Sequence, residues 1–266
     1  MKFIRSVLVV LVAATLGVWA GIAFGADAPN VDKPAQKVAA SDRWFVLASP
    51  KNEGSGYLHI TIKESGDPEA PIHVTYDCQR ISKYSTPVSI KLEILCLNDE
   101  WLSPVRLVGS LTAGPDARSS TATFTRPSPQ ATAGKLVVVR PGRADIESEV
   151  KERTVTAFTP LEIVARMPFE ENTSVKFALI EGVSDWRDHD AELSYAGQEE
   201  LEIKGQKQSL HKFTQKVMDG KDLDLSYWLN DKHEIVHAET DGAVLTPATE
   251  AEARAAVKVQ APEPRE

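Results

Sequence analysis

Short segments in which apolar and polar residues alternate follow one another from residue 44 almost to residue 240. Successive side chains of a strand point to opposite faces of a sheet, so this alternation is typical of strands with one buried face. Clusters of Gly, Pro, Asp and Ser separate the segments at the spacing of meanders, sandwiches and barrels. The predicted strands span residues 44–48, 57–62, 72–81, 88–97, 105–112, 120–125, 135–140, 175–180, 192–195, 200–204, 210–217 and 223–229, with a further extended stretch at 146–158.

Helical signals are few and short. Thr159-Pro160 offers an N-cap with proline at the first helical position, and Pro168 ends the predicted helix over residues 161–166. A capping box that starts at Thr249 predicts a second helix over residues 249–257. No long amphipathic helix interrupts the strands, so parallel βαβ units are not expected. We therefore predict a mainly all-β fold, a strongly curved antiparallel sheet or half-barrel with one or two short helices.

The first residues have a different pattern, that of an export signal. Lys2 and Arg5 precede an uncharged apolar run that extends to Ala26, and Ala23-Phe24-Gly25 places small residues at the positions that signal peptidase requires. The alternative is a retained membrane anchor, because about 18 uncharged apolar residues can span a bilayer. The predicted organisation is a signal peptide (1–25), a linker (26–43), an antiparallel β domain (44–242) and a flexible Ala/Glu/Pro-rich tail (243–266).

The charge of the chain argues against two classes of partner, nucleic acids and anionic lipids. The formal net charge of -8 argues against nucleic acid, whose binding depends on neutralising phosphates with Lys and Arg. No basic stripe that would attract anionic lipid is present in the sequence. We expect a periplasmic or secreted protein without a cofactor, and contact with a membrane only if the N-terminal segment is retained as an anchor.

The two cysteines both fall on the apolar face of their predicted strands. If those strands form a direct hairpin that turns near Ser85, Cys78 lies opposite Leu92. Cys96 then lies opposite Val74, so the thiols are four positions apart, or about 13 Å. A disulfide requires Cα atoms within roughly 7 Å, which a longer or bulged turn would allow. An exported protein meets an oxidising compartment, so a disulfide and two buried free thiols both remain open.

The string His233-Glu234-Ile235-Val236-His237 matches the zincin motif. On a helix, both imidazoles face one side and can hold zinc, while the glutamate activates a bound water. The surrounding residues favour a hairpin, because residues 223–229 alternate like a strand and Asn230-Asp231-Lys232 has the composition of a turn. In a strand, residues four apart lie about 13 Å from one another, too far for two ligands of one zinc. We predict a hairpin and no metal site, with a zinc metallopeptidase that uses His233, Glu234 and His237 as the alternative.

Other acidic residues suggest no catalytic pair. Glu162, Glu170 and Glu171 are close enough in sequence to be considered as a general acid and base. Nothing in the sequence indicates how far apart their carboxylates lie, and this separation defines such pairs. We interpret these residues as solvated surface charge.

Several segments of the C-terminal half follow one recognisable order: Thr159-Pro160-Leu161, Met167-Pro168-Phe169, residues 175–180, residues 197–201, Gly205, His211-Lys212-Phe213 and residues 227–232. With these segments the chain resembles a group of exported bacterial domains of unknown function, which are similar in architecture to the half-barrel of lipoprotein carriers. The likeness extends over residues 44–240 and implies a curved antiparallel sheet with helical elements on its concave side. It supplies no catalytic residues, and it places a closing hairpin across the His233–His237 string.

The functional prediction is a non-enzymatic envelope protein whose concave face binds a hydrophobic ligand or another envelope protein. Besides the metallopeptidase, a structural envelope module without a ligand is the remaining alternative. The same apolar alternation would also produce a plain core, which is the commoner role of such residues. The candidate lining of the concave face consists of Leu58, Ile60, Val74, Ile90, Leu92, Ile94, Leu223, Leu225 and Tyr227.

Overall fold

The computed structural model describes residues 38–49, 54–82, 85–114, 116–125, 133–180, 182, 186–218, 225–240 and 242–258. The predicted signal peptide, most of the predicted linker and the last eight residues lie outside these ranges. Among the described residues, no helix is both long enough and apolar enough to cross a bilayer.

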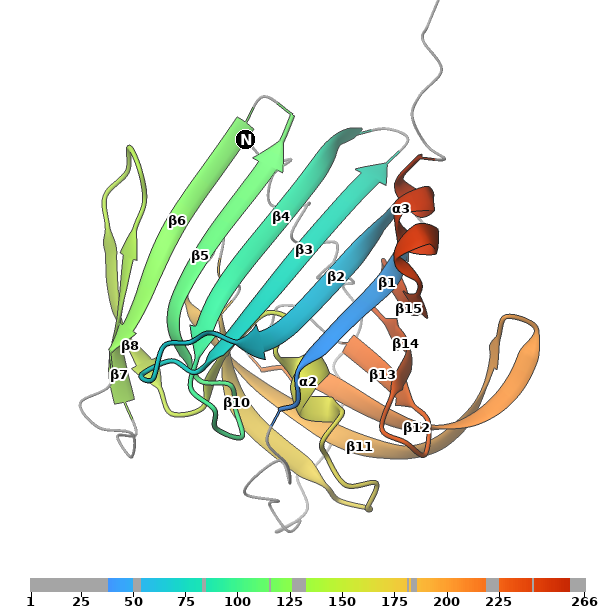
Figure 1. Cartoon of the computed structure of the whole chain (residues 1–266). Helices are drawn as coiled ribbons and strands as arrows, with labels where there is room; N and C mark the ends of the chain where they lie inside the picture. The colour runs from blue at the N-terminus through green and yellow to red at the C-terminus, as the bar shows by residue number, and fades with distance from the viewer. Residues whose placement is uncertain are drawn as a thin grey trace, which may run out of the picture.

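Fifteen strands and two short helices make up the described part of the chain (Figure 1). The strands of the first half are β1 (Ser41–Ser49), β2 (Gly54–Glu64), β3 (Ile72–Ser82), β4 (Ser85–Cys96), β5 (Pro104–Ala113), β6 (Asp116–Thr125), β7 (Ala133–Val139) and β8 (Ile146–Lys151). The second half contains β9 (Thr154–Thr156), α2 (Pro160–Val164), β10 (Ser174–Ile180), β11 (Asp188–Ile203), β12 (Gln206–Val217), β13 (Leu225–Leu229), β14 (Ile235–Glu239), β15 (Val244–Ala248) and α3 (Glu250–Lys258).

All fifteen strands belong to one sheet, with the order β8-β7-β6-β5-β4-β3-β2-β1-β15-β14-β13-β12-β11-β10-β9. The neighbouring strands are antiparallel except for β9 and β10, which run parallel. Only residues 152 and 153 separate β8 from β9, so the two edges of the sheet come together. The sheet therefore curls into a nearly closed barrel.

The inner face of the first half is a continuous apolar surface. Along β3 and β4, the in-phase positions are buried and the positions between them are half-buried or exposed. Tyr76 on β3 lies opposite Leu92 on β4, and its ring lies 5.0 Å from that of Phe158, just before α2. Helix α2 thus lies on the concave side of the sheet, as Figure 1 shows.

Helix α3 packs on the opposite, convex side, against β1 and β2 (Figure 1). Trp44 points outward there, with its ring stacked on His59 at 3.8 Å and the Arg254 guanidinium 5.0 Å from its centre. The Thr249 hydroxyl accepts a hydrogen bond from the Glu252 amide, and the Glu252 carboxylate accepts one from the Thr249 amide at 2.7 Å. This is the predicted capping box.

The structure confirms the predicted fold class, including the two short helices, and closes the sheet further than a half-barrel. The prediction of a flexible tail from residue 243 is wrong for residues 244–258. Strand β15 pairs with both β1 and β14, and it connects the two halves of the sheet. Its Ala/Pro-containing sequence resembles a tail, but Leu245 is buried in the core.

Both cysteines are free thiols buried in the core. Cys78 lies opposite Ile90 rather than Leu92, and Cys96 lies opposite Ile72 rather than Val74. Strand β3 extends to Ser82 and β4 begins at Ser85, so the hairpin closes earlier than expected and each pairing shifts by two residues. The thiols are six positions apart along the pair, or about 20 Å. Burial raises the pKa of the Cys78 thiol to about 12.

Candidate functional site

The predicted lining residues of the first half share one face of β2, β3 and β4. Leu58 lies opposite Cys78, which in turn lies opposite Ile90. Val74 lies opposite Ile94 in the same way. All of these side chains are buried and belong to a single apolar cluster, with exposed fractions of 5% or less. The alternation thus identified a continuous patch, and its role in ligand binding stays a prediction. The patch consists of Leu58, Ile60, Val74, Ile90, Leu92 and Ile94.

The remaining predicted lining residues belong to the second half of the sheet. Tyr227 on β13 is buried, and its hydroxyl donates to the Gln215 Oε1 at 3.1 Å. Leu225 is half-buried and packs against the same core, whereas Leu223 lies outside the described residues. This part of the inner face is therefore less purely apolar than the patch on β2–β4.

An ion pair connects the barrel wall to α2. The Arg43 Nη2 on β1 donates to the Glu162 Oε1 on α2, and the Glu162 side chain is 7% exposed. The Arg166 Nε donates to the backbone oxygen of Glu162 at 2.9 Å. Burial lowers the pKa of Arg43, an effect that the neighbouring Tyr76 partly offsets.

The interpretation of Glu162 as solvated charge is therefore wrong. Arg43 was assigned to the linker because the apolar alternation starts at Trp44. Yet Arg43 is in phase with Phe45 and Leu47, whose side chains are buried on the inner face. That phase is the only signal in the sequence that could have indicated an inward-facing arginine.

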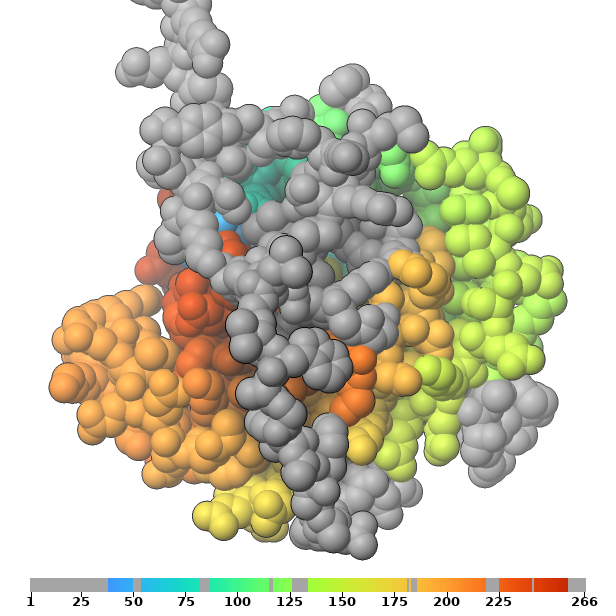
Figure 2. Space-filling view, turned by 180° about the vertical axis from the view of Figure 1, so that it is seen from behind, coloured from blue at the N-terminus to red at the C-terminus, as the bar shows by residue number. Residues whose placement is uncertain are grey.

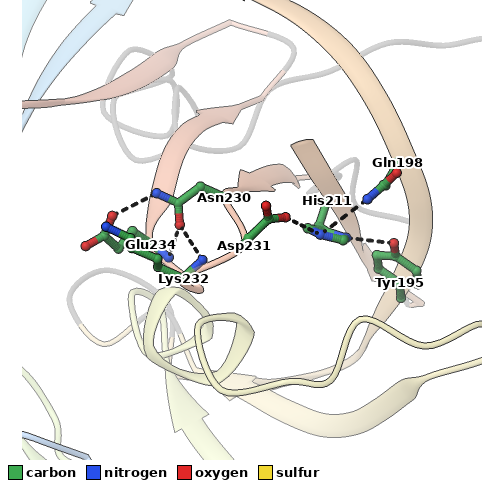
Figure 3. Close-up of polar contacts among 7 residues, drawn as sticks. All are labelled: Tyr195, Gln198, His211, Asn230, Asp231, Lys232 and Glu234. Atoms are coloured by element: carbon green, nitrogen blue, oxygen red, sulfur yellow. Dashed lines mark hydrogen bonds and ion pairs between the residues drawn. The ribbon is translucent and has the colours of Figure 1, made fainter. Parts of the chain in front are cut away.

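The predicted hairpin across the zincin-like string is confirmed. Strands β13 and β14 are antiparallel neighbours, with Leu229 opposite Ile235. The Asn230 side chain accepts hydrogen bonds from the amides of Lys232 and Glu234, both at 3.0 Å, which stabilise the turn (Figure 3). Asn side chains commonly form such bonds to backbone amides a few residues further on.

The two imidazoles of the string have different neighbours. His237 lies on β14, edge-on to the Trp228 ring at 5.1 Å and 3.7 Å from a Glu239 oxygen. His233 lies in the turn, at a left-handed backbone conformation with φ of 62°. The helix that the zincin motif requires is not formed, and the described residues contain no cluster of three metal-ligating side chains. The structure gives the metallopeptidase alternative no support.

His233 instead belongs to a stack of three rings. The Phe169 ring lies between His211, at 3.7 Å, and His233, at 4.0 Å, with both imidazoles nearly parallel to it. The rings come from the segment after α2, from β12 and from the closing hairpin. Burial lowers the pKa of His233, and the neighbouring His211 lowers it further.

Polar contacts hold His211 in this stack (Figure 3). Its Nδ1 lies 2.9 Å from the Tyr195 hydroxyl, and its Nε2 lies 3.1 Å from the Asp231 Oδ1. Three of the segments that carried the sequence resemblance, those with Phe169, His211 and Asp231, therefore meet at one place. Their function visible in the structure is to anchor the closing hairpin to the segment that leaves α2.

The hairpin β11–β12 extends beyond the rest of the sheet and is visible in orange at the edge of Figure 2. Residues 198–203 of β11 pair with β12, but β10 pairs only with the part of β11 before residue 195. This two-stranded extension carries Glu199, which accepts bonds from Lys212 and from the indole of Trp228.

No family model and no curated protein matches this chain in sequence. Among solved structures, the chain is similar to the crystal structure of a beta-barrel-like protein of the domain of unknown function DUF1849 from Brucella abortus. The TM-score is 0.55 at 9% sequence identity, and the match covers 80% of this chain and 98% of that chain. A likeness at this level of identity shows a shared fold. The fold is an antiparallel, barrel-like sheet.

Proposed function

We propose that this protein is a non-enzymatic, exported envelope protein that binds a hydrophobic ligand inside its barrel. The observation that carries the proposal is the continuous apolar inner face, which extends from β1 to β7 as one cluster. Such a surface binds apolar molecules because binding removes apolar area of both partners from water, and few specific contacts are needed.

The number of strands supports a ligand inside the barrel. Eight strands form a barrel that its own inward side chains just fill, and the diameter grows roughly in proportion to the strand number. This sheet has fifteen strands. Among the described residues, the five-residue helix α2 is the one helix on the concave side.

Export is proposed from the sequence of residues 1–25, which has the charged start, apolar run and small cleavage-site residues of a signal peptide. Fractionation of cells that produce the full chain tests it. The expected result is mature protein in the envelope or medium, with an N-terminus at Ala26. Full-length protein in the cytoplasm would contradict the proposal.

Binding is tested with a neutral fluorescent probe, N-phenyl-1-naphthylamine, added to the delipidated full chain. Ile90→Phe enlarges a side chain on the inner face, and Val108→Phe makes a similar change at an exposed position on the outer side of β5. If the interior holds a ligand, Ile90→Phe weakens probe binding about fivefold or more and Val108→Phe does not.

Two other outcomes of the same experiment would overturn the proposal. In a filled core without ligand space, Ile90→Phe destabilises the fold by roughly 1–3 kcal/mol and neither protein binds the probe. That result would favour a structural module. Equal binding by both variants would place the probe outside the barrel and would also overturn the proposal.

A further inference from the structure

Three buried polar atoms on the inner face of the barrel have no hydrogen-bond partner within the part of the chain that the structure describes. They are the Ser41 Oγ, the Arg43 Nε and the Tyr76 Oη. The Thr159 side chain is close enough to Tyr76 to influence its pKa, but it makes no hydrogen bond of normal geometry with the Tyr76 hydroxyl. Buried polar groups without a partner are uncommon and cost free energy, so three in one area require an explanation.

The register of the sheet brings these three side chains together. Arg43 lies opposite Ile60, and Ile60 lies opposite Tyr76 on the next strand. Arg43 and Tyr76 thus flank one buried isoleucine, with backbones about 10 Å apart and both side chains turned inward. Ser41 is two residues before Arg43 on the same face of β1.

The chemistry of this polar site is that of a hydrogen-bond donor set. The Arg43 Nε can only donate, and the hydroxyls of Ser41 and Tyr76 each carry a hydrogen. Burial raises the pKa of Tyr76, so its hydroxyl keeps its proton. Glu162 already neutralises the Arg43 charge through the ion pair. The site therefore fits an oxygen acceptor that is neutral or carries a single negative charge.

We propose that Ser41, Arg43 and Tyr76 form a head-group subsite that binds the acyl oxygen of a fatty acid or fatty ester, while its hydrocarbon tail lies along the apolar face of β2–β4. This inference rests on the proposed function and specifies the class of its ligand. The apolar face of β2–β4 begins beside the subsite, because Ile60 belongs to that face and lies between Arg43 and Tyr76 in the sheet.

The experiment measures how ligands with the same tail and different heads displace N-phenyl-1-naphthylamine from the delipidated full chain. The ligands are oleate, methyl oleate and oleylamine. We expect oleate or methyl oleate to bind roughly tenfold more tightly than oleylamine, whose charged head has only donors. Tighter binding of oleate would identify a fatty acid as the ligand, and tighter binding of methyl oleate would identify an ester.

Tyr76→Phe tests the subsite without disturbing the ring. Removing a hydroxyl that has no partner should leave the fold intact. We expect the variant to bind the neutral probe normally and to lose about threefold to tenfold in affinity for the preferred acyl ligand. Tyr57→Phe is the matched control, because Tyr57 is also buried but its hydroxyl donates to Asp77 outside the barrel. Ser41→Ala is a second variant with the same expected direction.

The outcomes separate the two proposals. If the wild-type protein binds no probe and no ligand, the proposed function fails and the subsite fails with it. If oleate, methyl oleate and oleylamine bind equally well, or Tyr76→Phe leaves the selectivity unchanged, the interior binds apolar molecules but the head-group subsite is wrong.

Discussion

The two halves of the barrel are built differently, although their strands belong to one sheet. In β1–β7, the inner face is formed mainly by aliphatic side chains that follow a strict two-residue alternation. In β9–β15, buried apolar residues are combined with specific contacts, among them the stack around Phe169 and the bond between Tyr227 and Gln215. The comparison shows how one sheet combines an apolar wall with a second wall whose side-chain contacts hold the closing hairpin in place.

The largest expected effect on stability concerns the apolar wall of β1–β7. Its residues should contribute to the free energy of unfolding only through the size and burial of their side chains. Leu92→Ala removes buried methyl groups and should lower the free energy of unfolding by about 2–5 kcal/mol. Leu92→Met conserves the volume and should cost less than about 1.5 kcal/mol. Urea denaturation measures both. A Leu92→Ala cost below that of Leu92→Met would contradict the view of this wall as closely packed.

The ion pair between Arg43 and Glu162 joins the two halves, because it connects β1 to α2. Arg43→Ala leaves a buried carboxylate without its partner and should destabilise the protein by about 2–4 kcal/mol. The control is Lys135→Ala, which breaks an exposed pair with Glu147 and should cost at most about 0.5–1 kcal/mol. Equal costs for the two variants would show that α2 does not depend on this contact.

The stack around Phe169 tests whether the second half depends on ring geometry. Phe169→Leu keeps an apolar side chain but removes the stacking on His211 and His233, together with the tilted ring contacts with Tyr195 and Phe213. It should cost about 1–2 kcal/mol in unfolding free energy. Phe124→Leu, on β6 of the first half, provides the comparison, because Phe124 makes no ring-to-ring contact with another described residue and its replacement should cost less stability. A larger loss at Phe124 would reverse the proposed contrast between the halves.

The smallest expected effect is a pH dependence to which His233 contributes. Burial lowers the pKa of His233 in the folded protein, so the unfolded chain takes up the proton first on acidification. Stability should therefore fall as the pH decreases through about 6.5, and the fall should level off below the folded pKa. His233→Asn keeps a residue type that tolerates the left-handed conformation and should flatten this dependence. Thermal unfolding of both proteins between pH 7.5 and 5 measures this dependence. If stability falls with pH as steeply in His233→Asn as in the unchanged protein, His233 is not responsible.

The sequence was sufficient to predict most of the first half, because each strand there shows its buried face by local alternation. Strand β15 was missed because its pairing with β1 involves residues about 200 positions apart, and Pro247 made the segment resemble a tail. The hairpin at Asn230 was predictable from turn chemistry, since all its bonds are local.

The contacts inside the barrel were not predictable either, because they join residues that are far apart in the sequence. Arg43 and Glu162 are 119 residues apart, so no local pattern in the sequence indicates that the two side chains pair. The stack around Phe169 combines rings from three separate segments, so only the fold brings them together. Tyr76 could be assigned to the inner face, but the missing partner of its hydroxyl is visible only in the structure.

Native mass spectrometry of the full-length protein, purified without detergent from the cells that produce it, tests the central claim most directly. The account predicts a species heavier than the polypeptide by the mass of one hydrophobic molecule, which is lost on extraction with organic solvent. A single species at the polypeptide mass, with no lipid in the extract and no uptake of added ligand, would contradict a ligand-binding interior.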